Sequence, residues 1–146
     1  MILAPGLHRF ADLSVGDRVE TAEEAVTERM IDAFAALTGD RYEIHMSDAA
    51  ARAAGFPRRV AHGLLVLSLM DGLKNRAPAR LDALASLGWD MRFEAPVLAG
   101  EPVRATFEVT RLRRAASGTA VAEFEASGLV GERMVQSGTM VLAMRG

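Results

Sequence analysis

Asp40 and His45 are the two residues of this sequence whose types and spacing best suit chemistry. They lie in the segment GDRYEIH at residues 39 to 45, with Gly39 directly before the aspartate. An aspartate that accepts a hydrogen bond from one histidine nitrogen fixes the histidine tautomer and leaves the other nitrogen free as a base. Alternatively, both side chains hold one water molecule and activate it by general acid–base catalysis. A third interpretation is structural, with Asp40 as a turn residue and His45 as a half-buried filler.

A second segment, AHG at residues 61 to 63, stands at the start of a strongly apolar stretch. If Gly63 opens a helix there, its backbone N–H is a free donor at the positive end of that helix. A glycine also lets a substrate carbonyl approach this donor closely, which is the geometry of an oxyanion site. The alternative is that Gly63 only relieves crowding where the helix enters the core. His62 is expected to be structural.

Three predicted helices position these segments. The apolar spacing predicts a helix over residues 28–37, with Thr27 as its N-cap and Gly39 at its end. Ser47 is the expected N-cap of a second helix, which Gly55 ends. The third begins at Gly63 and is apolar around nearly its whole circumference, which predicts a helix buried on all sides.

The chain changes character after Pro78, where strand patterns replace helical ones. The segment EPVRATFEVTRLRR alternates apolar and polar residues, and GTAVAEFEASG and RMVQSGTMVLAM continue the strand pattern. The segments AASG and SGLVGE are predicted to be turns between these strands. Helices followed by a run of antiparallel strands predict an α+β fold, with the sheet curled around the buried helix.

Composition excludes several classes of function. The chain has no cysteine, and its three histidines have no zinc-motif spacing, so no metal is expected. A net charge of −2 gives no reason to expect nucleic acid as a partner. The start of the chain lacks the pattern of a signal peptide, and its most apolar segment is too short to span a bilayer. We therefore expect a single domain over residues 1–146, in the cytoplasm and not in a membrane.

The sequence FAALTGDRYEIHMSD…GFPRRVAHGLLVLSLMDGL resembles the hydratase signature of the MaoC-like (R)-specific enoyl-CoA hydratases, which have the hotdog fold. The segments FADLSVGDRVE and RFEAPVLAGEPVRATFEV also resemble parts of that family. The resemblance implies that Asp40 and His45 are the catalytic pair and that the Gly63 N–H binds the thioester carbonyl. It further implies hydration of a trans-2-enoyl thioester or the reverse reaction. No cofactor beyond the coenzyme A or acyl-carrier thioester substrate is expected, and the assembly is expected to be a homodimer or larger.

Departures from the family pattern affect the substrate more than the catalytic pair. Tyr42 and Glu43 stand where the family often has Asn-Pro, and Ser47 replaces an aspartate. Asp71 stands where some hydratases have a serine on the central helix, and it is expected to pair with Lys74 or to contact a polar substrate. Tyr42 and Asp71 are therefore candidate substrate-binding residues.

Arg58 and Arg59 precede the central helix and are candidates for binding the phosphate groups of the carrier. Two other functions fit the same fold. One is an acyl-CoA thioesterase that uses a carboxylate on the central helix, for which Asp71 is the candidate. The other is a non-catalytic subunit that binds an acyl chain, which intact Asp40, His45 and Gly63 do not favour.

Overall fold

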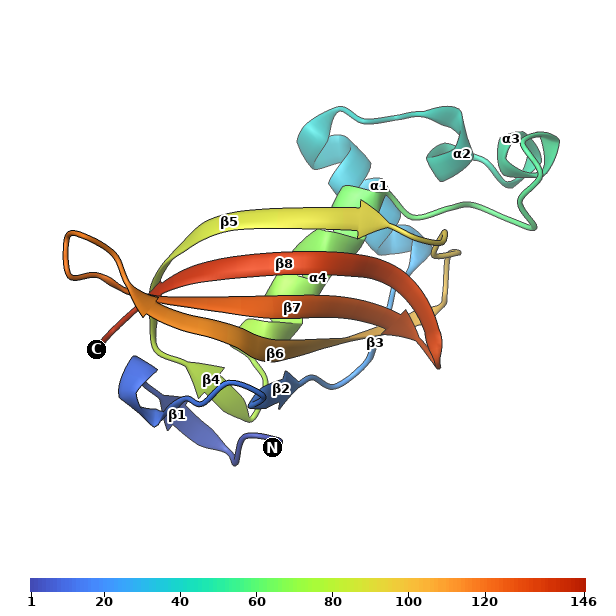
Figure 1. Cartoon of the computed structure of the whole chain (residues 1–146). Helices are drawn as coiled ribbons and strands as arrows, with labels where there is room; N and C mark the ends of the chain where they lie inside the picture. Colours follow the sequence, from blue (N-terminus) through green and yellow to red (C-terminus); the bar gives the residue numbers. More distant parts are fainter.

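A computed structural model describes the whole chain, residues 1–146. Helices fill the first half and long strands the second, as the sequence predicts (Figure 1). In chain order the elements are β1 (Gly6–His8), a 3-10 turn (Phe10–Asp12), β2 (Arg18–Glu20), β3 (Glu24–Ala25), α1 (Glu28–Thr38), α2 (Glu43–Met46), α3 (Asp48–Ala53), α4 (Gly63–Asn75), β4 (Ala79–Leu81), β5 (Ala83–Phe93), β6 (Pro102–Arg114), β7 (Ala120–Val130) and β8 (Arg133–Met144).

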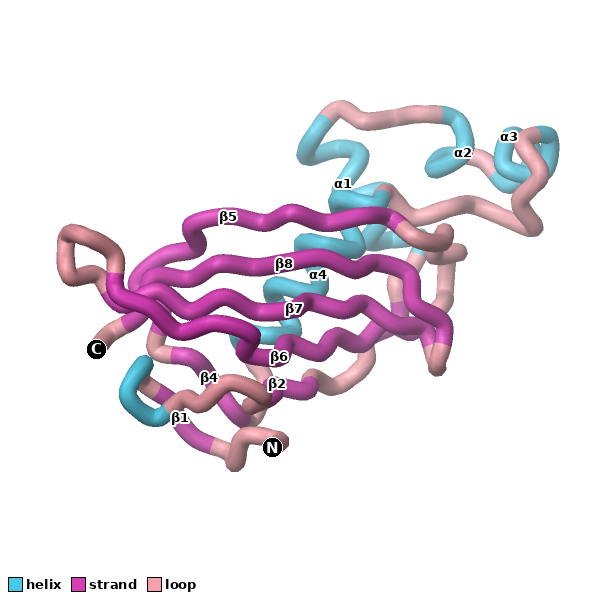
Figure 2. The backbone as a smooth tube through the Cα atoms, viewed as in Figure 1, coloured by secondary structure: helices cyan, strands magenta, loops and turns pink.

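The four long strands and β2 form one antiparallel sheet in the order β2–β6–β7–β8–β5 (Figure 2). The predicted alternation in β6 is confirmed, because Val103, Ala105, Phe107 and Val109 are buried. These side chains lie on one face of the sheet, as a period of two requires. The strand β5 lies at the edge of this sheet.

The helix α4 lies against the sheet, which curves around it (Figure 1). Val66 and Met70 of α4 are buried, and the Met70 sulfur packs where a side chain at Gly128 of β7 would stand. The prediction that α4 is buried on all sides is wrong, since Leu64 is 60% exposed and Ser68 is exposed. A single sheet covers one side of a helix, and the opposite side stays open.

The capping residues predicted around the first two helices are confirmed. The Thr27 hydroxyl accepts a hydrogen bond from the Met30 N–H at the start of α1. Gly39 ends α1 in the left-handed conformation at a φ of 79°, where a side chain would be strained. The Ser47 hydroxyl accepts from the Ala50 N–H at the start of α3.

Some elements differ from the sequence prediction. The segment SGLVGE was expected to be a turn, but β7 continues to Val130 and the turn begins at Gly131. The one-turn helix α2 and the parallel pair of β1 with β4 were not predicted. Elements of three or four residues carry too few side chains to show a periodic pattern. No helix is both long and apolar enough to cross a membrane.

Gly138 of β8 lies against the neighbouring strand so closely that a Cβ would stand 1.9 Å from the Asp90 carbonyl oxygen. We expect Gly138→Ala to lower the free energy of unfolding by about 1–3 kcal/mol or more, because β5 must move away from β8. Urea unfolding measures this loss. Gly88→Ala is the matched control, because its Cβ would meet no atom within 4 Å. Equal stability of the two variants would contradict the packing described.

Candidate active site

Asp40 is held by the turn that follows α1. Its N–H donates to the Thr38 hydroxyl at 3.2 Å, and one of its carboxylate oxygens accepts from the Tyr42 N–H at 3.2 Å. The residue is exposed. One carboxylate oxygen is occupied by the turn, and the other is free to bind a further group.

His45 stands on α2, and its orientation is set by the backbone of a distant segment. Its Nδ1 lies 2.7 Å from the Val60 carbonyl oxygen, which can only accept, so Nδ1 carries the hydrogen. The neutral ring therefore has its lone pair on Nε2, the form that takes up a proton. The tautomer is fixed by Val60 and not by Asp40, which favours the second chemistry considered for this pair. A backbone acceptor of this kind cannot be predicted from the sequence, because every residue has a carbonyl.

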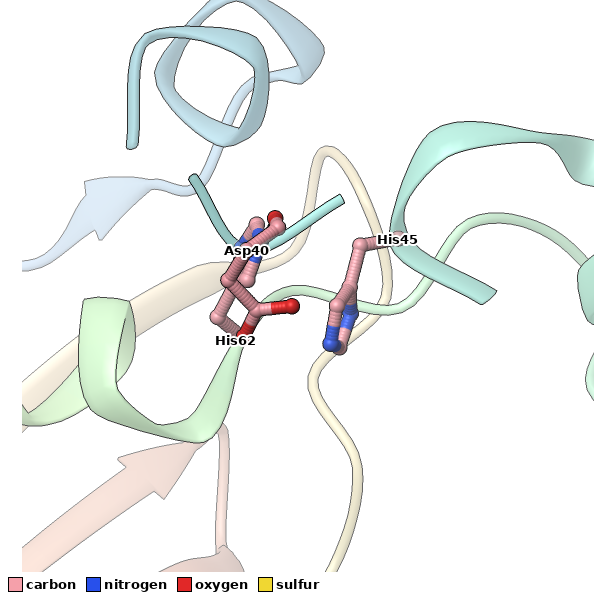
Figure 3. Close-up of side chains that lie close together, drawn as sticks. All are labelled: Asp40, His45 and His62. Carbon is pink, nitrogen blue, oxygen red and sulfur yellow. The ribbon is translucent and has the colours of Figure 1, made fainter. Parts of the chain in front are cut away.

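Asp40 and His45 face each other across a short gap (Figure 3). Their polar atoms, together with one of His62, all lie within 4.8 Å of one another. A water molecule spans such a gap with two hydrogen bonds of ordinary length, about 2.8 Å each. The pair is thus arranged to hold one water molecule between a carboxylate and an imidazole.

His62 contacts both Asp40 and His45. It is only 2% exposed, its Nε2–H donates to the Asp40 carbonyl oxygen at 2.9 Å, and its ring stacks on His45 with centroids 3.9 Å apart. Its Nδ1 is buried without a hydrogen-bond partner. His62 therefore holds both members of the pair in place, in agreement with the structural role predicted.

The same three side chains form the one group of metal-binding residue types in the structure. The two histidine rings are nearly stacked, at an interplanar angle of 30°, so their lone pairs lie in two almost parallel planes. Ligands of one metal ion must instead converge on it. The geometry suits a bound water molecule better than a metal ion.

Gly63 is the first residue of α4, and its N–H has no acceptor within the helix. It lines a cavity of about 250 Å³ together with His45, Val66, Phe93 and Gln136. A Cβ at this position would stand 2.4 Å from a ring carbon of Phe93, so a larger residue here would require that ring to move. The Gln136 amide donates to the Gly63 carbonyl oxygen at 2.7 Å and fixes the start of the helix.

The remaining predicted site residues do not line this cavity. Tyr42 is 66% exposed, with its ring centroid 6.3 Å from that of His45, and Arg58 is exposed with its Nε–H bonded to the Ala99 carbonyl. Asp71 does not line the cavity and pairs with Lys74 at 2.7 Å, as expected from the sequence.

Arg59 is buried, and its guanidinium is bound to Asp32 and to the His45 carbonyl oxygen. It is therefore not free to bind phosphate, which corrects the role expected for it. Its backbone N–H also donates to the Asp48 carboxylate at 2.9 Å. Arg59 instead fastens α1, α2 and α3 to one another. Neither this role nor the roles of Phe93 and Gln136 were predicted from the sequence.

Comparison with known proteins places the chain in a family. Residues 11–127 match the model of the MaoC like domain. An (R)-specific enoyl-CoA hydratase of Aeromonas caviae is 38% identical over 81 residues, which cover 56% of this chain and 60% of that protein. A 3-hydroxybutyryl-CoA dehydratase of Methylorubrum extorquens is 34% identical over 104 residues, covering 70% of this chain and 64% of that protein.

Solved structures agree with this match. An (R)-hydratase from A. caviae involved in PHA biosynthesis aligns with a TM-score of 0.77 at 29% identity, covering 90% of this chain and 97% of that one. The fold is thus the hotdog fold that the sequence predicts, a sheet wrapped around a central helix. The chain belongs to the family of MaoC-like domains, whose relatives named above are hydratases and dehydratases of acyl thioesters.

We expect Arg59→Met to lower the free energy of unfolding more than Arg58→Met does. The first removes charge-assisted hydrogen bonds to His45 and Asp32, worth about 1.5–3 kcal/mol. The second removes one bond from an exposed side chain to a carbonyl oxygen. Urea unfolding of both variants measures the difference. A loss for Arg58→Met as large as that for Arg59→Met would contradict the role assigned to Arg59.

Proposed function

We propose that this protein adds water to a trans-2-enoyl thioester, or removes it from the corresponding 3-hydroxyacyl thioester. One observation carries the proposal: His45 and Gly63 line the same cavity, and Asp40 faces His45. A base, a carboxylate and a carbonyl-binding donor are the three groups that this reaction requires. The family relationship supports the same reaction class, since relatives are named as hydratases and dehydratases.

In the proposed hydration, Asp40 and the His45 Nε2 hold the water molecule, which gives a proton to the His45 Nε2 as its oxygen bonds to C3. The electron pair of the C2–C3 double bond moves through C1 to the thioester oxygen. The Gly63 N–H, at the positive end of α4, stabilises the negative charge that develops there. The enolate-like intermediate then takes up a proton at C2 from the protonated His45, which returns to its neutral form. The reverse sequence removes water.

The carrier of the acyl group is proposed to be coenzyme A or an acyl-carrier protein, both of which bring phosphate groups. Arg58 is the remaining candidate for these groups, because it is exposed and is anchored to the Ala99 carbonyl near the cavity. The reaction as written uses only groups of the protein and the substrate. A thioesterase reaction loses its main support, because Asp71 pairs with Lys74 away from the cavity.

We expect Asp40→Asn to lower the rate of enoyl-thioester hydration by about 10²–10⁴-fold, because the uncharged amide holds the water molecule more weakly and does not stabilise His45 once it has taken up the proton. The measurement is loss of enoyl-thioester absorbance with a panel of trans-2-enoyl-CoA substrates, with thiol release followed in the same samples. Glu43→Gln is the matched control, since Glu43 is an exposed carboxylate of the same turn.

Turnover that survives in Asp40→Asn would overturn the proposed role of Asp40. Thiol release in place of hydration would assign a thioesterase. If the unaltered protein neither hydrates any substrate of the panel nor releases thiol, a non-catalytic acyl-binding role would be favoured.

We propose that two copies of the chain associate through β5. This strand is eleven residues long, lies at the edge of the sheet and has one side without a partner strand. Leu84 and Leu87 stand at two irregularities of its pairing with β8, and both are more than half exposed. An unpaired edge with exposed apolar side chains invites pairing with another copy. The cytoplasmic location stays a prediction from the sequence.

We expect Leu87→Glu to convert the dimer to a monomer, because the new carboxylates would be buried against the partner's edge. Sedimentation velocity measures the change in mass. Leu37→Glu is the control, because Leu37 is 83% exposed on α1. The β5 interface would be refuted by a monomeric unaltered protein, or by a Leu87→Glu variant that stays dimeric.

A further inference from the structure

Lys74 is the only lysine in the sequence, and it is buried, with 4% of its surface exposed. Its ammonium pairs with Asp71 at 2.7 Å and lies 5.4 Å from the centre of the Trp89 ring. Taking a charge out of water is costly, and an apolar residue of similar size is often as stable or more stable in such a place. The mechanism above does not use Lys74, so this charge has no assigned role.

Lys74 lies on the same side of α4 as Gly63. The two are eleven residues apart, which is close to three whole turns. The lysine side chain reaches back to Asp71, whose position is about 12 Å along the axis from Gly63. An acyl chain whose carbonyl binds the Gly63 N–H and which follows the helix therefore leads toward this ion pair.

Residues of the edge strand β5 contact both ends of this stretch of α4, from Gly63 to Lys74. Phe93 packs against Gly63 at one end, and Trp89 lies under the Lys74 ammonium at the other. Met91 stands between them on the same face of the strand, since side chains alternate. Leu67 of α4 and Met91 are both only half-buried, so the side chains between the two ends are apolar and keep part of their surface exposed.

The Lys74 ammonium group has three hydrogens to donate, and fewer strong acceptors lie within hydrogen-bond distance of it. Its three hydrogens have Asp71 as the one oxygen acceptor, with the Met140 sulfur at 3.5 Å as a weak second one. The aromatic rings of Trp89 and Phe107 also lie beside it, with ring centres at 5.4 and 5.9 Å. A further oxygen atom would complete its hydrogen bonds. Because Asp71 already neutralises the charge, an uncharged oxygen suits the place better than a second carboxylate, which would be left unbalanced.

We propose that Lys74 selects acyl chains of medium length whose far end carries an uncharged oxygen, such as a hydroxyl or keto group. This inference rests on the proposed hydratase function and names its substrate class. The thioester end binds at Gly63, the apolar middle lies along Leu67 and Met91, and the terminal oxygen accepts a hydrogen bond from Lys74.

The test compares trans-2-enoyl-CoA substrates of equal length that end in a methyl, a hydroxyl, a keto or a carboxylate group. The unaltered protein is expected to show a kcat/KM about tenfold or more higher for the hydroxyl or keto chain than for the methyl chain. In Lys74→Met this ratio falls to one or below. In Asp71→Asn the ammonium is no longer neutralised, so the carboxylate-ended chain becomes the preferred one.

The double variant Lys74→Met with Asp71→Asn removes both charges and guards against misfolding of either single variant. It is expected to prefer the methyl-ended chain. Equal kcat/KM for all chain ends in the unaltered protein would overturn the inference and leave the hydratase function standing, as would a ratio unchanged by Lys74→Met.

Failure of the hydratase function itself is distinguishable. In that case no chain is hydrated, and binding of the same thioesters to Asp40→Asn, measured by calorimetry, reports the preference for the chain end. The inference about Lys74 is then supported if that preference disappears when Lys74→Met is added, and it is overturned if the preference remains.

Discussion

The candidate site depends on the extended stretch of residues 59–62, which leads into α4 and is hydrogen-bonded to the turn that carries Asp40 and His45. Within it, the Val60 N–H donates to the Ile44 carbonyl oxygen at 3.0 Å, and the Val60 carbonyl accepts from the ring of His45. His62, at the end of the stretch, holds the Asp40 carbonyl oxygen. Each such hydrogen bond contributes only about 1 kcal/mol, but together they fix His45 and Asp40 relative to Gly63, the next residue. In the proposed reaction, placement of this kind before the substrate arrives lowers the entropic cost.

The other side of the same stretch is bonded to the loop after β5. The Ala61 N–H donates to the Val97 carbonyl oxygen at 2.8 Å, and the Ala99 N–H donates to the Arg59 carbonyl oxygen at 2.9 Å. This loop leads directly into the sheet, so the candidate site is tied to the most extensively hydrogen-bonded part of the fold. Phe93, at the end of β5, completes the connection by packing against Gly63.

The sequence predicted the parts of this site that are made by periodicity and by distinctive side chains. The alternation in β6, the caps Thr27 and Ser47, and the closeness of Asp40 and His45 all follow from local rules. Contacts made through backbone atoms or between distant segments were not predictable. Val60 acts through its carbonyl, which every residue has. The exposed face of α4 was also missed, because an apolar pattern does not say which neighbour covers each side.

The turn that carries Asp40 and His45 differs in stability from the sheet that holds it. The helix α2 has no buried residue, and it is one turn long. Segments with few buried contacts open locally at a lower free energy than global unfolding requires. A single opening of this turn separates Asp40 and His45 from Gly63, while the sheet and α4 remain folded. Heat resistance of the candidate site and heat resistance of the fold are therefore separate properties of this protein.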